Sequence, residues 1–237
     1  MIRNIIFDWS GTLVDDLPAV WQASNAVLRR AGVAEQTLEQ FRAEFCLPFR
    51  QFYDRFTPHL PLEQLESWFY EAFRQLQDLV TEIPQAREFL LFCRQRGMRT
   101  FLLSSVHATY FDLQSARNGF KVYLDHAYVE IGDKRLSIRE LVAQHRLAAA
   151  ETLLVGDMQH DIETAHWGGV RACAVLTGYN RRAQLEASQP DLVVANLGEL
   201  RRHLESHQMD LQGRMGPLLP QAAKASPGLP LPHSSAA

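Results

Sequence analysis

Lysine is scarce in this chain: only three of its 24 basic residues are lysines, namely Lys121, Lys134 and Lys224. The 27 acidic residues bring the formal net charge to −3, which argues against a strongly cationic protein that binds nucleic acid or a membrane surface. We therefore expect no nucleic acid and no membrane among its partners. Any chemistry that needs a lysine has few side chains available.

Cysteine is also rare, and Cys46, Cys93 and Cys173 lie far apart in apolar surroundings. Their odd number and wide spacing fit neither a disulfide framework nor a metal site, so we expect free thiols in a reducing compartment. No apolar stretch approaches the roughly 18 residues that span a bilayer, and no secretory signal pattern opens the chain. These absences predict a cytoplasmic protein.

Short apolar runs typical of buried parallel strands recur along the chain. They cover residues 2–8, 99–103, 127–130, 152–155, 171–176 and 192–194. Helical patterns separate the runs, which predicts an α/β fold with helices on both faces of a parallel sheet. One of these helices is expected after Lys134, opened by a capping box of Ser137 and Glu140.

Residues from about 17 to 80 differ, because they contain helical patterns only. Pro48 opens a predicted helix over residues 49–56, and an apolar stripe follows over residues 62–76. The many aromatic side chains stand at helical spacing, which favours the core of a small helical bundle over a ligand cage. We predict one domain over residues 1–15 and 84–207, an all-α subdomain over 16–83, and a disordered Pro- and Ala-rich tail over 213–237.

The central motif is Asp8-Trp9-Ser10-Gly11-Thr12, directly after the first strand. Open α/β sheets bind ligands at the carboxyl ends of their strands. Gly11 allows a tight turn, in which backbone amides are able to face an anion. Alone, Asp8 would be interpreted as a helix cap or turn residue.

A second acidic motif makes the functional interpretation stronger. Asp157 and Asp161 follow another apolar strand, four residues apart, so both reach one site. Carboxylates gathered there would repel one another unless a hard cation joins them, and oxygen ligands indicate Mg²⁺. Ser104 and Ser105 end a third strand with hydroxyls suited to a phosphoryl oxygen, and Lys134 supplies positive charge.

These four motifs, in this order, resemble those of the haloacid dehalogenase superfamily, in its phosphatase branch with a helical cap, as in phosphoglycolate phosphatases. The resemblance covers about residues 1–207 and implies a Rossmann-like core with a cap over the site. It implies that Asp8 is the nucleophile and that Asp8, Asp157 and the carbonyl of Ser10 hold Mg²⁺, supported by Asp161. It also implies that Ser104 and Lys134 bind the phosphoryl group. We expect Asp8, Ser10 and Lys134 as catalytic residues, and we expect the substrate to contact Gly11, Thr12, Ser104 and Ser105.

Ser10 departs from the family pattern, Asp-x-Asp-Gly-Thr, whose second aspartate serves as acid and base. A serine hydroxyl does not replace it at neutral pH, and such catalysis is typically worth about 10²–10⁴ in rate. Three side chains are candidate substitutes: Asp16, His107 and His160. Their alternative roles are a helix cap for Asp16, a helix cap for His107, and orientation of Asp161 for His160.

Other activities remain open at this point. Phosphonatases and dehalogenases also lack the second aspartate, but a phosphonatase needs a cap lysine and residues 17–82 contain none. A dehalogenase needs no Mg²⁺, which leaves the acidic motif unexplained. A catalytically impaired protein that binds a phosphorylated ligand is the third alternative. For the main hypothesis we expect a small phosphorylated metabolite as partner, Arg50 as a specificity contact, and a monomer or homodimer.

Overall fold

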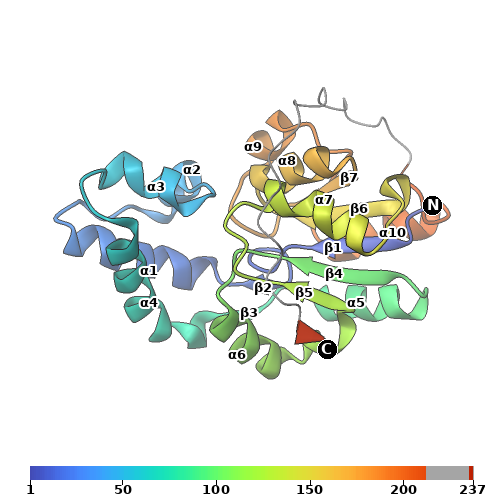
Figure 1. Cartoon of the computed structure of the whole chain (residues 1–237), viewed down its shortest axis with the longest axis horizontal. Coiled ribbons are helices and arrows are strands. Elements are labelled where there is room, and N and C mark those ends of the chain that lie inside the picture. The colour runs from blue at the N-terminus through green and yellow to red at the C-terminus, as the bar shows by residue number, and fades with distance from the viewer. Residues whose placement is uncertain (212–234, 237) are drawn as a thin grey trace.

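The computed structural model describes residues 1–211 and 235–236, and its centre is a sheet with strand order β8–β7–β6–β1–β4–β5–β9 (Figure 1). Its parallel strands are β1 (Asn4–Phe7), β4 (Arg99–Leu103), β5 (His126–Tyr128), β6 (Thr152–Gly156), β7 (Arg171–Val175) and β8 (Leu192–Val194). Every one lies within two residues of an expected apolar run. The predicted α/β fold with a parallel sheet is therefore confirmed.

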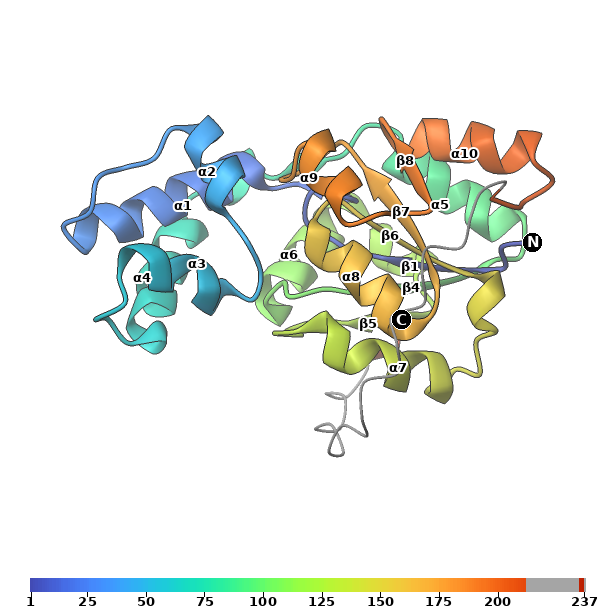
Figure 2. The same cartoon turned by 90° about the horizontal axis from the view of Figure 1, so that it is seen from above.

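Helices cover both faces of the sheet, with α5 (Ala86–Gln95) and α10 (Leu197–Ser206) on one side (Figure 2). The other side is covered by α7 (Lys134–Gln144), α8 (Gln159–Gly168) and α9 (Arg182–Ala187). Neighbouring residues of β1 point to opposite faces, as an extended strand requires. Phe7 packs into the core with α5 and α10, whereas Ile6 packs into the core with α7 and α8.

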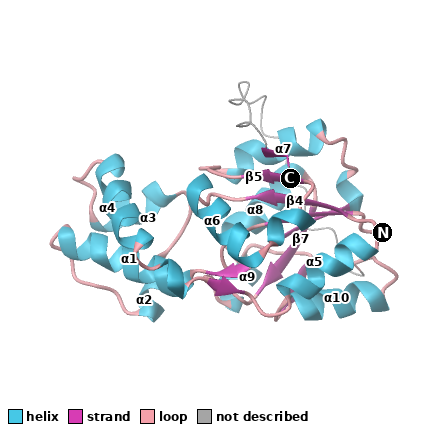
Figure 3. Ribbon diagram, turned by 90° about the horizontal axis from the view of Figure 1, so that it is seen from below, coloured by secondary structure: helices cyan, strands magenta, loops and turns pink. Residues whose placement is uncertain are grey.

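The helices expected between the first two strands form a group beside the sheet (Figures 1 and 3). They are α1 (Leu17–Arg30), α2 (Leu38–Glu44), α3 (Phe49–Phe56) and α4 (Leu62–Arg74). Phe41 and Phe52 are fully buried in their shared core, which also holds Leu65. The aromatic residues thus build a helical core, because each contributes a large apolar area to it.

Two short antiparallel strands carry the chain out to this helical group and back. They are β2 (Val14–Asp15) and β3 (Thr81–Glu82), with Val14 opposite Glu82. The remaining helix that flanks the sheet is α6 (Ala108–Asn118), and single helical turns cover Gln77–Leu79, Phe120–Tyr123 and Ala149–Glu151. This connection brings α1 directly after the Asp8 motif, so the helical group lies next to that motif.

Two sequence-based expectations differ from the structure. Helix α7 begins at Lys134 and is capped by Asp133, whose carboxylate accepts a hydrogen bond from the Arg135 amide at 3.0 Å. Ser137 lies inside this helix, so the predicted capping box is wrong. The predicted disordered tail falls outside the described residues except at Ser235–Ala236, which form β9, antiparallel to β5.

Two further expectations concern features that the sequence lacks. All three cysteines are free, as predicted. In the part of the chain that the structure describes, no helix is long and apolar enough to cross a membrane.

Candidate active site

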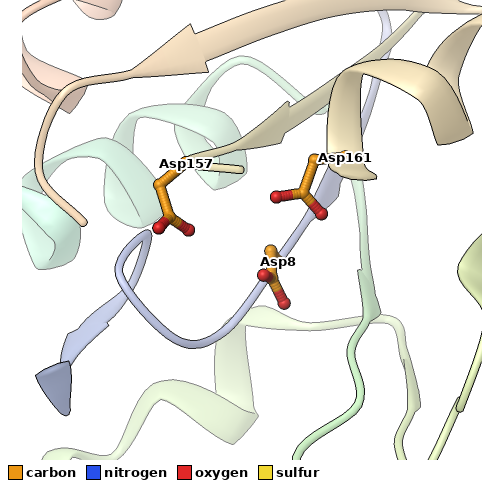
Figure 4. Close-up of side chains that lie close together, drawn as sticks. All are labelled: Asp8, Asp157 and Asp161. Atoms are coloured by element: carbon orange, nitrogen blue, oxygen red, sulfur yellow. The ribbon is translucent and has the colours of Figure 1, made fainter. Parts of the chain in front are cut away.

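Three aspartates meet at the carboxyl ends of β1 and β6 (Figure 4). Asp8 follows β1, Asp157 follows β6, and Asp161 lies in the first turn of α8. One carboxylate oxygen of each lies within 4.8 Å of the others. All three residues are at most 4% exposed. The structure thus brings together the three carboxylates that the sequence predicted to converge.

Lys134 contacts two of these carboxylates. Its Nζ atom lies 2.8 Å from Asp8 Oδ2 and 2.7 Å from Asp161 Oδ1, and its side chain is only 1% exposed. Burial alone would lower the pKa of Lys134, but the charges of Asp161 and Asp8 raise it above its usual value. Lys134 therefore remains charged, and it offsets one of the three carboxylates.

The remaining negative charge of the cluster, together with burial, raises the pKa values of Asp8 and Asp157. Burial raises the pKa of Asp157 well above its usual value, and repulsion by Asp161 and Asp8 adds to the effect. The pKa of Asp8 is raised by burial and by Asp161, although Lys134 opposes this. A buried set of oxygen ligands with excess negative charge suits a hard divalent cation such as Mg²⁺. The residues present therefore fit such an ion.

Glycine makes room for the acidic cluster. A Cβ atom on Gly11 would lie 2.4 Å from Asp157 Oδ2, and Gly11 has φ +69°, a conformation that favours glycine. The turn is also closed on itself, because the Gly11 amide donates to the Val14 carbonyl at 2.7 Å. This amide is therefore paired within the turn.

Asp157 is held by two donors. Thr12 Oγ1 donates to its Oδ1 atom at 3.2 Å, and the backbone amide of Tyr179 donates to its Oδ2 atom at 2.7 Å. Thr12, predicted to contact the substrate, is fully buried and supports a carboxylate instead. Tyr179, which the sequence analysis missed, lies in the loop after β7, at the same edge of the sheet.

The half-buried Ser10 and the buried Tyr179 both contact the carboxylate of Asp16. Ser10 Oγ donates to Asp16 Oδ2 at 2.6 Å, and the Tyr179 hydroxyl donates to Asp16 Oδ1 at 2.9 Å. Asp16 precedes α1 but its side chain makes no capping hydrogen bond, so the helix-cap alternative is wrong. Burial raises the pKa of Asp16 to about 7, opposed by the hydrogen bonds from Ser10 and Tyr179.

The two histidines proposed as substitutes have other partners. His107 caps α6, since its Nδ1 atom accepts from the Thr109 amide at 3.2 Å. His160 Nε2 accepts from the Lys134 amide at 3.2 Å, so it orients Lys134 rather than Asp161. Burial and the nearby Lys134 charge lower the pKa of His160 to about 4, which keeps it neutral at pH 7.

A pocket opens beside this cluster, and Asp8, Ser10, Asp16 and Ser105 line it. Ser104 is buried, and its hydroxyl accepts from the Val106 amide at 3.3 Å, so it supports the loop after β4. Arg50 is exposed, forms an ion pair with Asp54 at 2.7 Å, and does not line the pocket. The structure does not support its predicted role as a specificity contact.

Comparison with known proteins agrees with this geometry. A family model described as haloacid dehalogenase-like hydrolase matches residues 5–175. A phosphoglycolate phosphatase of Synechococcus elongatus is 29% identical over 210 residues, which cover 84% of this chain and 95% of that protein. A 5'-nucleotidase of Pseudomonas aeruginosa is 27% identical over 218 residues, covering 86% and 96% respectively.

Solved structures show the same fold. A predicted phosphatase from Clostridium acetobutylicum superposes with a TM-score of 0.78 at 14% identity, covering 87% of this chain and 100% of that one. A haloacid dehalogenase-like family protein from Streptococcus pneumoniae gives a TM-score of 0.73 at 19% identity, covering 86% and 98%. With the family model spanning most of the sheet and the acidic cluster, the chain belongs to the haloacid dehalogenase-like hydrolases.

Proposed function

We propose that this protein is a Mg²⁺-dependent phosphatase that hydrolyses a small phosphorylated metabolite through an aspartyl-phosphate on Asp8. The contact that carries the proposal is the 2.8 Å pair between Asp8 and the buried Lys134. Asp8, the proposed nucleophile, lines the pocket with the ammonium group of Lys134 beside it. The matched family model and the names of the relatives support this class of reaction.

The chemistry proceeds in two displacements. A carboxylate oxygen of Asp8 attacks phosphorus, and the bond from phosphorus to the leaving alcohol oxygen breaks. Water then attacks the phosphorus of the aspartyl-phosphate, which releases inorganic phosphate and restores Asp8. A covalent intermediate divides one difficult displacement into two easier ones. Lys134 stabilises the negative charge that gathers on the phosphoryl oxygens.

Asp8, Asp157 and the backbone carbonyl of Ser10 would hold Mg²⁺, with Asp161 supporting. When bound, the ion would neutralise charge on the carboxylates and on the substrate phosphate. The support for this assignment is the converging oxygen ligands and the raised pKa values of Asp8 and Asp157.

Asp16 supplies the acid and base that Ser10 does not. Its carboxyl group lines the same pocket as Asp8, and it accepts a hydrogen bond from Ser10 Oγ, whose residue lines the pocket too. As an acid, Asp16 gives a proton to the leaving oxygen, directly or through Ser10. As a base, it takes a proton from the attacking water. The short contact between Ser10 and Asp16 favours this assignment over the impaired-binder alternative.

The proposal is tested by phosphate release from a panel of phosphomonoesters with and without Mg²⁺. We expect Mg²⁺-dependent turnover that falls at least about 10³-fold in Asp8→Asn, since the amide does not attack phosphorus. The matched control is Asp54→Asn, which changes an exposed carboxylate on α3. Equal turnover in Asp8→Asn and wild type would contradict the mechanism. Absence of turnover from the entire panel would favour the impaired binder.

A further inference from the structure

Most of the side chains that line the pocket beside Asp8 are apolar or aromatic, and the polar ones besides the catalytic residues include Ser105 and His107. Its wall toward the helical group is built from side chains of α1, α3, α4, α6 and the loop between α2 and α3: Val20, Phe45, Phe49, Phe69, Tyr70 and Tyr110. Phe49, Phe69 and Tyr70 remain partly exposed, so they offer apolar surface to a bound molecule. This wall faces the site where a leaving group would lie.

Positive charge is missing from the same wall. Of the described residues that line the pocket, none is lysine or arginine. His107 is the one basic side chain among them, and its Nε2 atom lies 3.3 Å from Glu130. Lys134 lies beside Asp8 and Asp161, where the phosphoryl group would bind, and does not line the pocket. Arg42 donates to the backbone carbonyls of Gly178 and Tyr179 instead.

Negative groups, by contrast, lie at the base of the pocket. Asp8 and Asp16 both line it, and no lysine or arginine of the described chain does, so a carboxylate on the substrate would lose its hydration without gaining a cationic partner. Arg74 and Arg117 line a neighbouring cleft, beyond Tyr70 and Tyr110, which line both. We therefore expect the site to accept a substrate with a negative charge far from the phosphate, but not one with a negative charge next to the phosphate.

We infer that the substrate is a phosphate monoester whose leaving group is uncharged and apolar where it adjoins the phosphate. This rests on the proposed function and narrows it, because it excludes short acidic substrates such as phosphoglycolate, which carry a carboxylate two atoms from the ester oxygen. An apolar group gains free energy in proportion to the area it buries against the aromatic wall.

Binding of phosphonates tests this without turnover and without differences in leaving-group acidity. Benzylphosphonate, methylphosphonate and phosphonoacetate differ only in the group on the carbon next to phosphorus: phenyl, hydrogen or carboxylate. In calorimetric titrations with Mg²⁺, we expect benzylphosphonate to bind at least about tenfold more tightly than methylphosphonate. Phosphonoacetate is expected to bind no more tightly than methylphosphonate.

Variants then test whether the aromatic wall causes the preference for benzylphosphonate over methylphosphonate. Phe69→Ala removes part of the aromatic wall and is expected to lower the benzyl-over-methyl ratio about fivefold or more. Trp68→Ala is the matched control, because Trp68 is the adjacent half-buried aromatic on α4, packs against Arg30, and does not line the pocket. Phe49→Arg is a second variant and is expected to shift the preference toward phosphonoacetate.

The outcomes separate this inference from the phosphatase proposal. Tighter binding of phosphonoacetate than of benzylphosphonate, or equal effects of Phe69→Ala and Trp68→Ala on the ratio, would overturn the inference alone. Selective binding of benzylphosphonate without any hydrolysis of benzyl phosphate would support the apolar site and contradict the proposed phosphatase activity. Failure of all three phosphonates to bind would overturn both.

Discussion

Asp16 is the residue on which the account of acid–base catalysis depends. We expect Asp16→Asn to lower kcat by about 10²–10⁴, since the amide neither gives nor takes the required proton. Asp15→Asn is the matched control, because Asp15 is the neighbouring carboxylate and does not line the pocket. Addition of Ser10→Asp to Asp16→Asn is expected to restore part of the rate. Steady-state kinetics with benzyl phosphate would refute the role of Asp16 if Asp16→Asn kept the wild-type rate.

The same residue makes metal-free stability depend on pH. Burial raises the pKa of Asp16 to about 7, against about 3.9 for an unfolded aspartate. Between these values the folded state binds more protons than the unfolded state. The free energy of unfolding therefore falls as pH rises from about 4 to 7, by at most about 4 kcal/mol from this group.

Denaturant unfolding in EDTA at about pH 5 and pH 7.5 measures how the free energy of unfolding changes with pH, which is the slope in question. Asp16→Asn is expected to flatten it, because the amide does not titrate. Asp8 and Asp157 contribute with the same sign, since their pKa values are also raised. His160 contributes with the opposite sign, because its pKa is lowered to about 4, so the test is the difference between the two proteins. Equal pH dependence of stability in wild type and Asp16→Asn would contradict the raised pKa of Asp16.

At the scale of elements, the turn between β6 and α8 leaves no space for a side chain at Gly156. A Cβ atom there would lie 2.3 Å from Asp161 Cγ, so Gly156→Ala is expected to displace Asp161 from Lys134. Overpacking of this kind typically costs about 1–3 kcal/mol of stability, and we expect at least about a tenfold loss of activity. Gly132→Ala is the control, since a Cβ atom on Gly132 meets no other atom within 4 Å.

Unfolding curves and kcat of both glycine variants decide this prediction. If Gly156→Ala and Gly132→Ala behaved alike, the turn would not position Asp161 in the way that the contacts indicate.

The strands were predictable because each is a buried apolar run that carries its own signal. The apolar runs at 99–103 and 192–194 match β4 and β8 to the residue. The start of α7 was not predictable, because Asp133 and Ser137 are both suitable N-cap residues and the sequence alone does not decide between them. Asp133 caps earlier than Ser137, and this places Lys134 in the first turn, pointing at Asp8.

Side-chain partners across the fold were the hardest to predict. Asp16 resembles a helix cap in sequence, and its actual partner Tyr179 lies 163 residues further along the chain. Arg50 was expected to face the substrate, yet its pairing with Asp54 depends on helix α3 facing outward at that position. Such contacts follow from tertiary packing, for which local patterns carry no information.

For the molecule as a whole, metal binding and folding should be linked. An ion that binds only the folded state at a concentration of 100 Kd stabilises it by about 2.7 kcal/mol. For a chain of this size, we expect the melting temperature to rise by about 5–10 °C. Asp157→Asn is expected to lose most of this shift. Thermal melts in EDTA and in excess Mg²⁺ that coincided for wild type would contradict the metal site.

The central claim is that Asp8 becomes phosphorylated during turnover. The most direct measurement is peptide mass spectrometry of protein quenched in acid during hydrolysis of benzyl phosphate with Mg²⁺. We expect one phosphoryl group on the peptide that contains Asp8 in the wild type, and none in Asp8→Asn. Wild-type turnover by Asp8→Asn, or a phosphoryl group on another residue, would contradict it.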